Sequence, residues 1–439
     1  MKGYQAIIGL GKTGLSCVRF CLREQLPFVV TDSREHPPGE EELLKLVPHS
    51  QRTFGRFDKD FIFNAERLII SPGVSLKEPL ICDAIRNSVP YVGDIELFVQ
   101  RIHSPIVAIT GANAKSTVTT LVGEMAKKAR INVKVAGNIG TPVLDLLNEP
   151  LADLYVLELS SFQLETTFSL QAAAATILNI SEDHMDRYEN MEEYLAAKLR
   201  IFHHCKVNVI NRADTRTWPS SIPTDYISFG LSQSSEGYGF IEQQKKGYLT
   251  RNGEKIIAAE ELKIAGKHNV ENALAALALG EAIGLDLIAM IETLKEFTGL
   301  PHRCQFVCEH HGVAWYNDSK GTNVGASLAA LEGFGRDKNI ILIAGGRGKS
   351  ADFTPLCEPV KKYVRAVILL GEAAEELRQI LENCCRVIHV DTLEEAVEQA
   401  RKIAQSGEIV LLSPACSSLD MFENYEHRGR VFEECAIKF

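Results

Sequence analysis

The sequence has no uninterrupted apolar run of the length that a membrane-spanning helix requires. Its start also lacks the small-residue cleavage pattern of a secretory signal, because residues 4–10 already read as a strand. These absences predict no membrane insertion and a location in the cytoplasm.

The chain has fewer basic residues than acidic ones. The chain has 47 Lys and Arg against 57 Asp and Glu, which gives a formal net charge of -10 at pH 7. This balance argues against a broad nucleic-acid surface but still allows a local basic pocket for a small anion. We therefore expect small-molecule substrates and no nucleic-acid partner.

Metal-binding cysteine patterns are missing too. None of the eleven cysteines forms a Cys-x-x-Cys pair, and Cys17, Cys21, Cys304 and Cys308 lie four apart among apolar residues. Cysteines of this kind behave as small buried side chains. We predict reduced thiols and no zinc site.

What the chain does contain is a repeated alternation of strand-like and helix-like segments. Its 439 residues are too many for one ordinary core, and the alternation predicts α/β domains with largely parallel sheets. Residues 226–257 read as additional short strands or hairpins. Breaks near residues 93 and 299 predict three domains, residues 1–93, 94–298 and 299–439.

The most informative motif is residues 111–117, Gly-Ala-Asn-Ala-Lys-Ser-Thr, between an apolar run and a helix-like segment. A strand-turn-helix of this kind directs backbone N–H groups at an anion, while Lys115 can reach outer phosphates and the Ser116 or Thr117 hydroxyl can bind Mg²⁺. The match is incomplete, because Ala114 and Ile109 stand where the general pattern has glycine. The pattern predicts a nucleoside triphosphate site, and a small-residue turn with an exposed lysine is the alternative.

A second glycine pattern, Gly-Leu-Gly-Lys-Thr-Gly at residues 9–14, fills the first predicted strand-to-helix turn. Asp32 follows at nearly the spacing of an acid that binds ribose. Tight packing of strand against helix explains the glycines equally well. A dehydrogenase with a nicotinamide cofactor is the alternative function that this turn leaves open.

Polar side chains follow other predicted strands. Glu158 and His184 lie at the ends of two strands of the middle segment, where a carboxylate and an imidazole could bind Mg²⁺ directly or through water. The alternative for His184 is a hydrogen-bonded loop histidine, and most lysines placed like Lys198, in a helix-like segment, are solvated. Asn269 and Asn272 share one helix face, although Asn269 could instead cap the helix.

Six segments together resemble the Mur ligase family: residues 110–117, 157–163, 182–188, 266–269, 300–303 and 317–320. The likeness runs from end to end. Residues 348–353 and 412–420 look like the signatures of the members that add D-glutamate to UDP-N-acetylmuramoyl-L-alanine. The resemblance implies an ATP-dependent ligase of peptidoglycan precursor synthesis that works through an acyl phosphate. It also implies Rossmann-like first and third domains around a central phosphate-loop-type sheet with extra β-strands, and a monomer is expected.

The resemblance also implies the role of each site residue. The UDP-linked substrate would be bound by Gly11, Lys12, Thr13, Gly14, Asp32, Ser33, Arg34, Gly73, Asn138, Ser161, Gln163 and His184. ATP would be bound by Gly111, Ala112, Asn113, Ala114, Lys115, Ser116, Thr117, Asn269, Asn272, Arg303, Asp318 and Lys320. D-Glutamate would be bound by Thr322, Lys349, Ser418 and Tyr425. The catalytic groups would be Lys115, Glu158, His184, Lys198 and Lys320.

Two Mg²⁺ ions would be held by Ser116, Glu158, His184 and Lys198, the last as a carbamate. In related ligases the matching lysine is carbamylated, which turns a cation into an oxygen ligand of the kind that Mg²⁺ prefers. The chain departs from the family at Ala112 and Ala114, which predicts weaker ATP binding. These departures motivate one alternative, a nucleotide-binding homologue with impaired catalysis.

Overall fold

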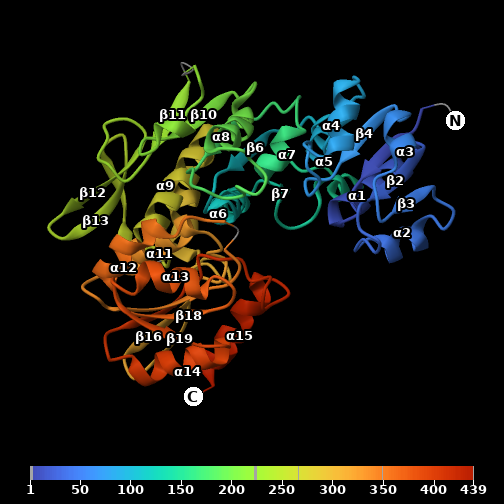
Figure 1. Cartoon of the computed structure of the whole chain (residues 1–439). Helices are drawn as coiled ribbons and strands as arrows, with labels where there is room; N and C mark the ends of the chain where they lie inside the picture. The colour runs from blue at the N-terminus through green and yellow to red at the C-terminus, as the bar shows by residue number, and fades with distance from the viewer. Residues whose placement is uncertain (1–2, 222–224, 265, 349, 439) are drawn as a thin grey trace.

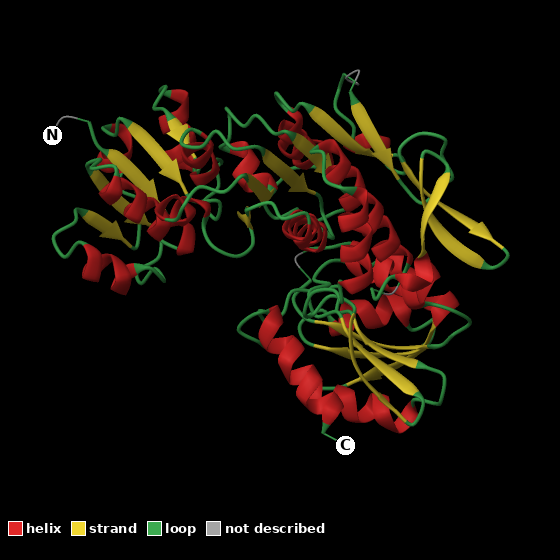
Figure 2. Cartoon of the chain, turned by 180° about the vertical axis from the view of Figure 1, so that it is seen from behind, coloured by secondary structure: helices red, strands yellow, loops and turns green. Residues whose placement is uncertain are grey.

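The computed structural model describes residues 3–221, 225–264, 266–348 and 350–438. Three β-sheets with flanking helices form three domains, as predicted, and the N-terminal and C-terminal domains lie on different sides of the central one (Figure 1). Figure 2 shows the same arrangement from behind, with helices packed against the sheets. Within the described residues, no helix has the length and apolarity to cross a bilayer.

The N-terminal sheet is fully parallel, in the order β3-β2-β1-β4-β5. Its strands are β1 Gln5–Ile8, β2 Phe28–Asp32, β3 Arg52–Phe54, β4 Arg67–Ile70 and β5 Tyr91–Val92. Its helices are α1 Lys12–Arg23, α2 Glu40–Leu46, α3 Lys59–Phe63 and α4 Pro79–Arg86. This order agrees with the Rossmann-like fold that the first domain was expected to have.

The central sheet runs β14-β13-β12-β11-β10-β9-β6-β8-β7. Its strands are β6 Ile106–Thr110, β7 Val133–Gly137, β8 Leu154–Glu158, β9 Ala174–Ile177, β10 Val207–Asn211, β11 Tyr226–Phe229, β12 Tyr238–Gln243, β13 Lys246–Arg251 and β14 Glu254–Ala258. Its helices are α5 Asp94–Val99, α6 Lys115–Lys128, α7 Ser161–Glu165, α8 Met191–Leu199, α9 Lys267–Ala282 and α10 Leu287–Glu296, with 3₁₀ turns η1 Val143–Asn148, η2 Arg200–Phe202, η3 Thr215–Thr217 and η4 Ala259–Glu261. The last three strands pair antiparallel, which confirms the extra strands.

Two hydrophobic cores cover the faces of the central sheet. Val107 and Ile109 of β6 face the core that α6, α9 and α10 share, whereas Ala108 faces the opposite core. That second core is continuous with the N-terminal domain, and Phe98 meets Tyr155 edge-on in it at 5.1 Å. The first two sheets are therefore anchored to one another through buried side chains.

The C-terminal sheet runs β15-β16-β20-β17-β18-β19, with only β15 antiparallel to its neighbour. Its strands are β15 Gln305–His310, β16 Val313–Asn317, β17 Ile340–Gly345, β18 Val364–Leu370, β19 Arg386–His389 and β20 Ile409–Leu412. Its helices are α11 Val324–Phe334, α12 Cys357–Tyr363, α13 Ala374–Leu381, α14 Leu393–Ile403 and α15 Tyr425–Ile437, with the 3₁₀ turn η5 Thr354–Leu356. Separate apolar clusters cover its two faces.

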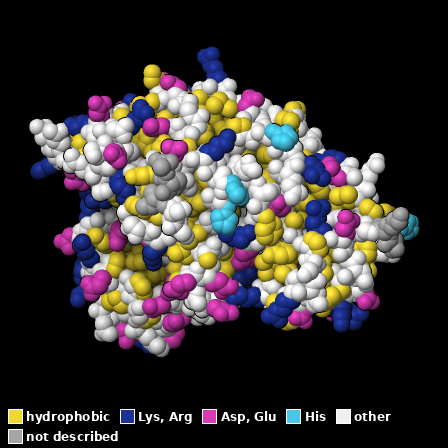
Figure 3. Space-filling model, turned by 90° about the horizontal axis from the view of Figure 1, so that it is seen from above, with side chains coloured by type: hydrophobic (Ala, Val, Ile, Leu, Met, Phe, Trp, Pro, Cys, Tyr) yellow, Lys and Arg dark blue, Asp and Glu magenta, His cyan; other side chains and the backbone are white. Residues whose placement is uncertain are grey.

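Charged side chains are mixed on the face seen from above, where lysines and arginines are interspersed with acids (Figure 3). No continuous basic area covers this face, in keeping with the acidic net charge.

Candidate active site

The phosphate loop joins β6 to α6, as the sequence predicted. Its last residue, Ala114, has φ 65° and ψ -3°, a left-handed conformation that usually needs glycine. Asn179, just beyond β9, holds the loop: its Oδ1 accepts from the Asn113 N–H at 2.8 Å and its carbonyl accepts from the Ala112 N–H at 3.0 Å. The neighbouring strand end thus fixes the loop.

Two lysines converge on one carbonyl of this loop. The Lys115 Nζ donates to the Gly111 and Ala112 oxygens at 2.9 and 2.8 Å, and the Lys198 Nζ donates to the same Gly111 oxygen at 2.9 Å. Burial lowers the pKa of Lys115, and burial together with the Lys115 charge lowers the pKa of Lys198 well below its usual value. Lys198 is only 1% exposed, so the alternative of a solvated lysine is wrong.

Glu158 and Ser116 form the centre of the site. The Ser116 hydroxyl donates to Glu158 Oε2 at 2.6 Å, and Asn138 Nδ2 donates to Glu158 Oε1 at 2.9 Å. Arg303, from beyond the central domain, donates its Nη2 to the Ser116 hydroxyl oxygen, also at 2.6 Å. Residues predicted separately from four parts of the sequence therefore meet here, with Thr117 buried in the first turn of α6.

The oxygen donors at this centre fit a magnesium ion that a nucleotide brings with it. Among the residues that the structure describes, no three His, Cys, Asp or Glu side chains form a ready-made metal cluster. Mg²⁺ usually takes one or two protein carboxylates, and phosphates and water complete its shell. The buried Glu158 carboxylate beside the Ser116 hydroxyl matches that requirement.

His184 lies in the loop after β9, in a left-handed conformation with φ 60°. Its Nε2 is 3.6 Å from Asp183 Oδ2, and its ring meets Phe162 edge-on at 4.9 Å. The loop alternative therefore describes its location correctly. Its ligand role stays a prediction.

The C-terminal domain contributes a second group of charges. The Lys320 Nζ lies 3.9 Å from the centre of the Tyr425 ring, and burial, aided by the charges of Arg303 and Lys115, lowers the pKa of Lys320 to about 8. Asp318 is buried and accepts from Ser413 Oγ at 2.8 Å, and burial raises its pKa to about 6. These shifts mark a crowded, poorly solvated site.

Asn269 and Asn272 lie together on α9, as their spacing predicted. Asn272 Nδ2 donates to Asn269 Oδ1 at 3.1 Å, and both side chains are buried. The alternative that Asn269 caps this helix is wrong, because Gly266 occupies the N-cap position and no side chain caps it.

In the N-terminal domain the glycines have different surroundings. A Cβ at Gly14 would lie 2.0 Å from the Gly9 oxygen, so the third glycine of the pattern is required for packing, whereas a Cβ at Gly11 or Gly73 would meet nothing within 4 Å. Lys12 and Ser33 are exposed, while Thr13 lies in the first turn of α1. Packing therefore explains Gly14, whereas the ligand-binding role of Gly11 and Gly73 stays a prediction.

Asp32 is 2% exposed and satisfied within its own domain. It accepts from the Leu10 N–H at 2.6 Å and from Arg34 Nη2 at 2.6 Å. Burial opposes ionisation of Asp32, but these hydrogen bonds outweigh it and lower its pKa. The carboxylate therefore shapes the turn directly.

The remaining substrate candidates have local partners. Gln163 forms a capping box with Ser160 at the start of α7, where Ser161 is also buried. Thr322 donates its N–H to the Lys320 oxygen at 2.8 Å, and the Ser418 oxygen accepts from the Phe422 N–H at 2.8 Å. Lys349 lies outside the described residues.

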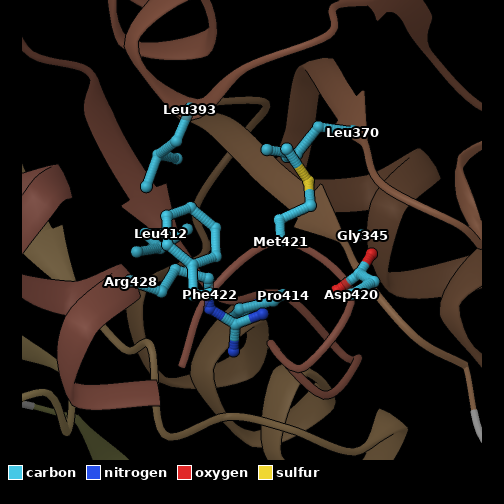
Figure 4. A pocket seen from close by; sticks show the side chains of 10 residues that line it. Gly345, Leu370, Leu393, Leu412, Pro414, Asp420, Met421, Phe422 and Arg428 are labelled. Carbon is cyan, nitrogen blue, oxygen red and sulfur yellow. The ribbon is translucent and has the colours of Figure 1, made fainter. Parts of the chain in front are cut away.

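A small cavity lies at the carboxyl ends of β17, β18 and β20. Figure 4 shows apolar side chains around it, with Asp420 and Arg428 on one side. Arg428 donates to the Ser319 and Cys416 oxygens. It thereby ties the loop that carries Lys320 to the loop that carries Ser418.

Sequence reasoning missed Arg187 as a link between domains. Its Nη1 and Nη2 donate to the Pro72 and Val74 oxygens at 2.9 and 2.7 Å, on either side of Gly73, and its guanidinium lies 4.1 Å from the Phe162 ring centre. The residue stands in a motif quoted above, but nothing in its spacing reveals a partner more than a hundred residues away.

Three family models match the chain, each over one of its sheets. They are described as Mur ligase MurD-like, N-terminal domain, over residues 4–93; Mur ligase middle domain, over residues 109–280; and Mur ligase, glutamate ligase domain, over residues 302–416.

Individual relatives and solved structures are also similar to this chain. A UDP-N-acetylmuramoylalanine–D-glutamate ligase from Pseudomonas aeruginosa is 52% identical over 433 residues, which cover 98% of this chain and 96% of the relative. Among solved structures, MurF from Acinetobacter baumannii matches with a TM-score of 0.62 at 16% identity, over 87% of this chain and 92% of that one. MurC from Thermotoga maritima, a UDP-N-acetylmuramate-alanine ligase, matches with a TM-score of 0.60 at 20% identity over 98% of both chains. These two structures share the fold.

Proposed function

The chain belongs to the Mur ligase family, and on that premise we propose that it joins D-glutamate to UDP-N-acetylmuramoyl-L-alanine in an ATP-dependent step of peptidoglycan precursor synthesis. The observation that carries the chemistry is the convergence of Lys115 and Arg303 on the phosphate loop, beside the buried Glu158 and Lys198. Such a site neutralises a triphosphate and positions its terminal phosphoryl group.

The reaction has two steps. An oxygen of the substrate carboxylate bonds to the γ-phosphorus as the bond to the β-phosphate oxygen breaks, which gives an acyl phosphate and ADP. The D-glutamate amine then bonds to the acyl carbon, and phosphate leaves from the tetrahedral intermediate with loss of a proton from nitrogen. Neither step needs a protein nucleophile, so the side chains act by positioning and charge.

Each residue has a role in this scheme. Lys115, Arg303 and Lys320 would hold phosphate oxygens through charge-assisted hydrogen bonds. Asn269, Asn272 and Asp318 would bind the rest of ATP. Ser116, Glu158, His184 and Lys198 would hold two Mg²⁺ ions, which when bound neutralise phosphate charge.

Lys198 enters that set only after it reacts with CO₂. The free amine nitrogen bonds to the carbon and loses one proton to solvent, and the product is a carbamate anion. Burial lowers the pKa of Lys198 and so favours the neutral amine that this step consumes. The environment of Lys198 therefore supports carbamylation.

We assign the substrates to domains in the same way. Residues 1–93 would bind the UDP-linked substrate through the turn at Gly11 and the loop at Gly73, residues 94–298 would bind ATP, and residues 299–439 would bind D-glutamate through Thr322, Lys349, Ser418 and Tyr425. The enzyme would act as a monomer in the cytoplasm.

Phosphate release by the full chain tests the proposal. With UDP-N-acetylmuramoyl-L-alanine, ATP and Mg²⁺ present, we expect release that depends on D-glutamate and not on L-lysine or meso-diaminopimelate. ATP binding without such release would establish the alternative, a homologue with impaired catalysis. NAD(P)H binding would support the other alternative, a dehydrogenase, which only the first glycine turn suggests.

A further inference from the structure

Asn323 precedes helix α11 in the C-terminal domain, and its amide contacts the central domain. Its Oδ1 accepts from the Ala326 N–H at 2.8 Å and so caps the helix. Its Nδ2 donates to Asn113 Oδ1 and to Asp183 Oδ2, each at 3.2 Å. Asn323 thus accepts a hydrogen bond within the C-terminal domain and donates hydrogen bonds to the central domain.

The two acceptors belong to the two loops that form the nucleotide site. Asn113 is part of the phosphate loop, and its Nδ2 also reaches Ser181 Oγ at 3.4 Å. Asp183 precedes His184 and lies 3.6 Å from its Nε2. Asn323 is therefore placed to hold both loops at once.

The start of α11 is built for this close approach. A Cβ at Gly325 would lie 2.7 Å from Ser181 Oγ and 3.2 Å from Asn113 Nδ2. A side chain at position 325 would push the helix away from the phosphate loop. Asn323 itself is 8% exposed, and both of its donated hydrogen bonds are partly buried.

Helix capping alone does not account for these contacts. Asn190 and Asn424 cap α8 and α15 through the same Oδ1 contact, at 2.9 and 2.8 Å. A cap requires only this acceptor. The Nδ2 contacts of Asn323 with the central domain are additional to it.

We propose that Asn323 is a positioning residue of the ligase reaction, which fixes the phosphate loop and the His184 loop against the domain that receives the amino acid. The inference rests on the proposed function for its substrates. It goes further by coupling the ATP site to the turn of residues 318–323, which carries Lys320 and Thr322.

The test is Asn323→Ser, which keeps a capping hydroxyl but removes both donated hydrogen bonds to the central domain. With two partly buried hydrogen bonds lost, we expect KM for ATP to rise about tenfold, and KM for the UDP-linked substrate to stay within about twofold. The matched control is Asn190→Ser, which makes the same change at the start of α8, where the cap hydrogen bond from the Glu193 N–H is exposed, and should leave every KM within about twofold.

A second variant and a binding assay keep the outcome decisive. Asn323→Asp preserves size and cap but sets a carboxylate against Asp183, so it should raise KM for ATP more than Asn323→Ser does. A fluorescent ATP analogue, titrated without amino acid, should bind both variants more weakly than wild type whether or not D-glutamate is the correct substrate. If both variants lower only Tm and leave KM and analogue affinity unchanged, Asn323 is a structural cap and the proposal is overturned.

Discussion

Residues 9–14 and residues 111–116 both join a buried parallel strand to the start of a helix, and both begin with a glycine of positive φ. In the first loop, the Leu10 N–H is taken by the carboxylate of Asp32, and Lys12 is exposed. In the second, Lys115 and the buried Lys198 point at loop carbonyls and Glu158 closes the site.

The two loops differ in the charge and burial of their side chains rather than in their backbone arrangement. An exposed lysine in water adds little to binding because solvent and salt screen it. Cations held in a poorly solvated site interact strongly with a phosphoryl group and with each other. Similar strand-turn-helix loops can therefore serve as a binding surface in one domain and as a reaction centre in another.

The largest effect should come from Lys198. Lys198→Arg keeps a long basic side chain but cannot form the carbamate, so we expect turnover to fall about 1000-fold, in line with the loss of several kcal/mol of metal-assisted stabilisation. Phosphate release at saturating substrates measures turnover, and thermal unfolding checks that the variant folds. Lys12→Arg is the matched control in the first loop, with a KM for the UDP-linked substrate within about twofold of wild type.

The carbamate itself can also be detected directly. With ¹³C-labelled bicarbonate, the wild type should show a carbamate resonance that Lys198→Arg lacks. Normal turnover in Lys198→Arg would refute the carbamate and remove the main contrast between the two loops.

The sequence predicted the local structure of both loops, but not this contrast. Strand-turn-helix patterns, the extra strands β11–β14 and the three α/β domains follow from periodicity and turn residues, which are local properties. The burial of Lys198 depends on how α8 packs beneath the phosphate loop. No residue within a turn of Lys198 signals that packing.

Contacts between domains were the least predictable part of the site. Arg303 was correctly placed among the ATP candidates, yet its bond to Ser116 joins residues 187 apart. Asn323 was not a candidate at all, although its neighbour Thr322 was. Such contacts depend on the relative orientation of two folded domains, and no local pattern encodes that orientation.

The pH profile should show the next largest effect. Burial lowers the pKa of Lys320 to about 8, so the ammonium that holds phosphate is present below pH 8 and is lost as pH rises through that value. We expect kcat/KM for ATP to fall about tenfold for each pH unit above about 8. Lys320→Arg should shift this descending limb to higher pH, and an unchanged limb would assign it to another group.

Ala114→Gly should make the two loops more alike. Ala114 has φ 65°, and relief of a left-handed alanine is worth about 1 kcal/mol. We expect a higher Tm and a KM for ATP that falls about two- to threefold, because the loop reaches its phosphate-binding geometry with less strain. Arg130→Gly is the matched control, since Arg130 has φ 62° at the other end of α6. It should raise Tm without changing KM, and a fall in KM there as well would contradict the local explanation.

The smallest effect is expected at Lys12, the counterpart of Lys115. Lys12→Met should raise KM for the UDP-linked substrate about twofold at low salt, because an exposed cation is screened by solvent, and the effect should vanish near 1 M salt. Lys115→Met should instead reduce turnover severely at either salt concentration. If Lys12→Met proves as damaging as Lys115→Met and insensitive to salt, then exposure is a poor guide to function here, and the two loops are equivalent phosphate sites.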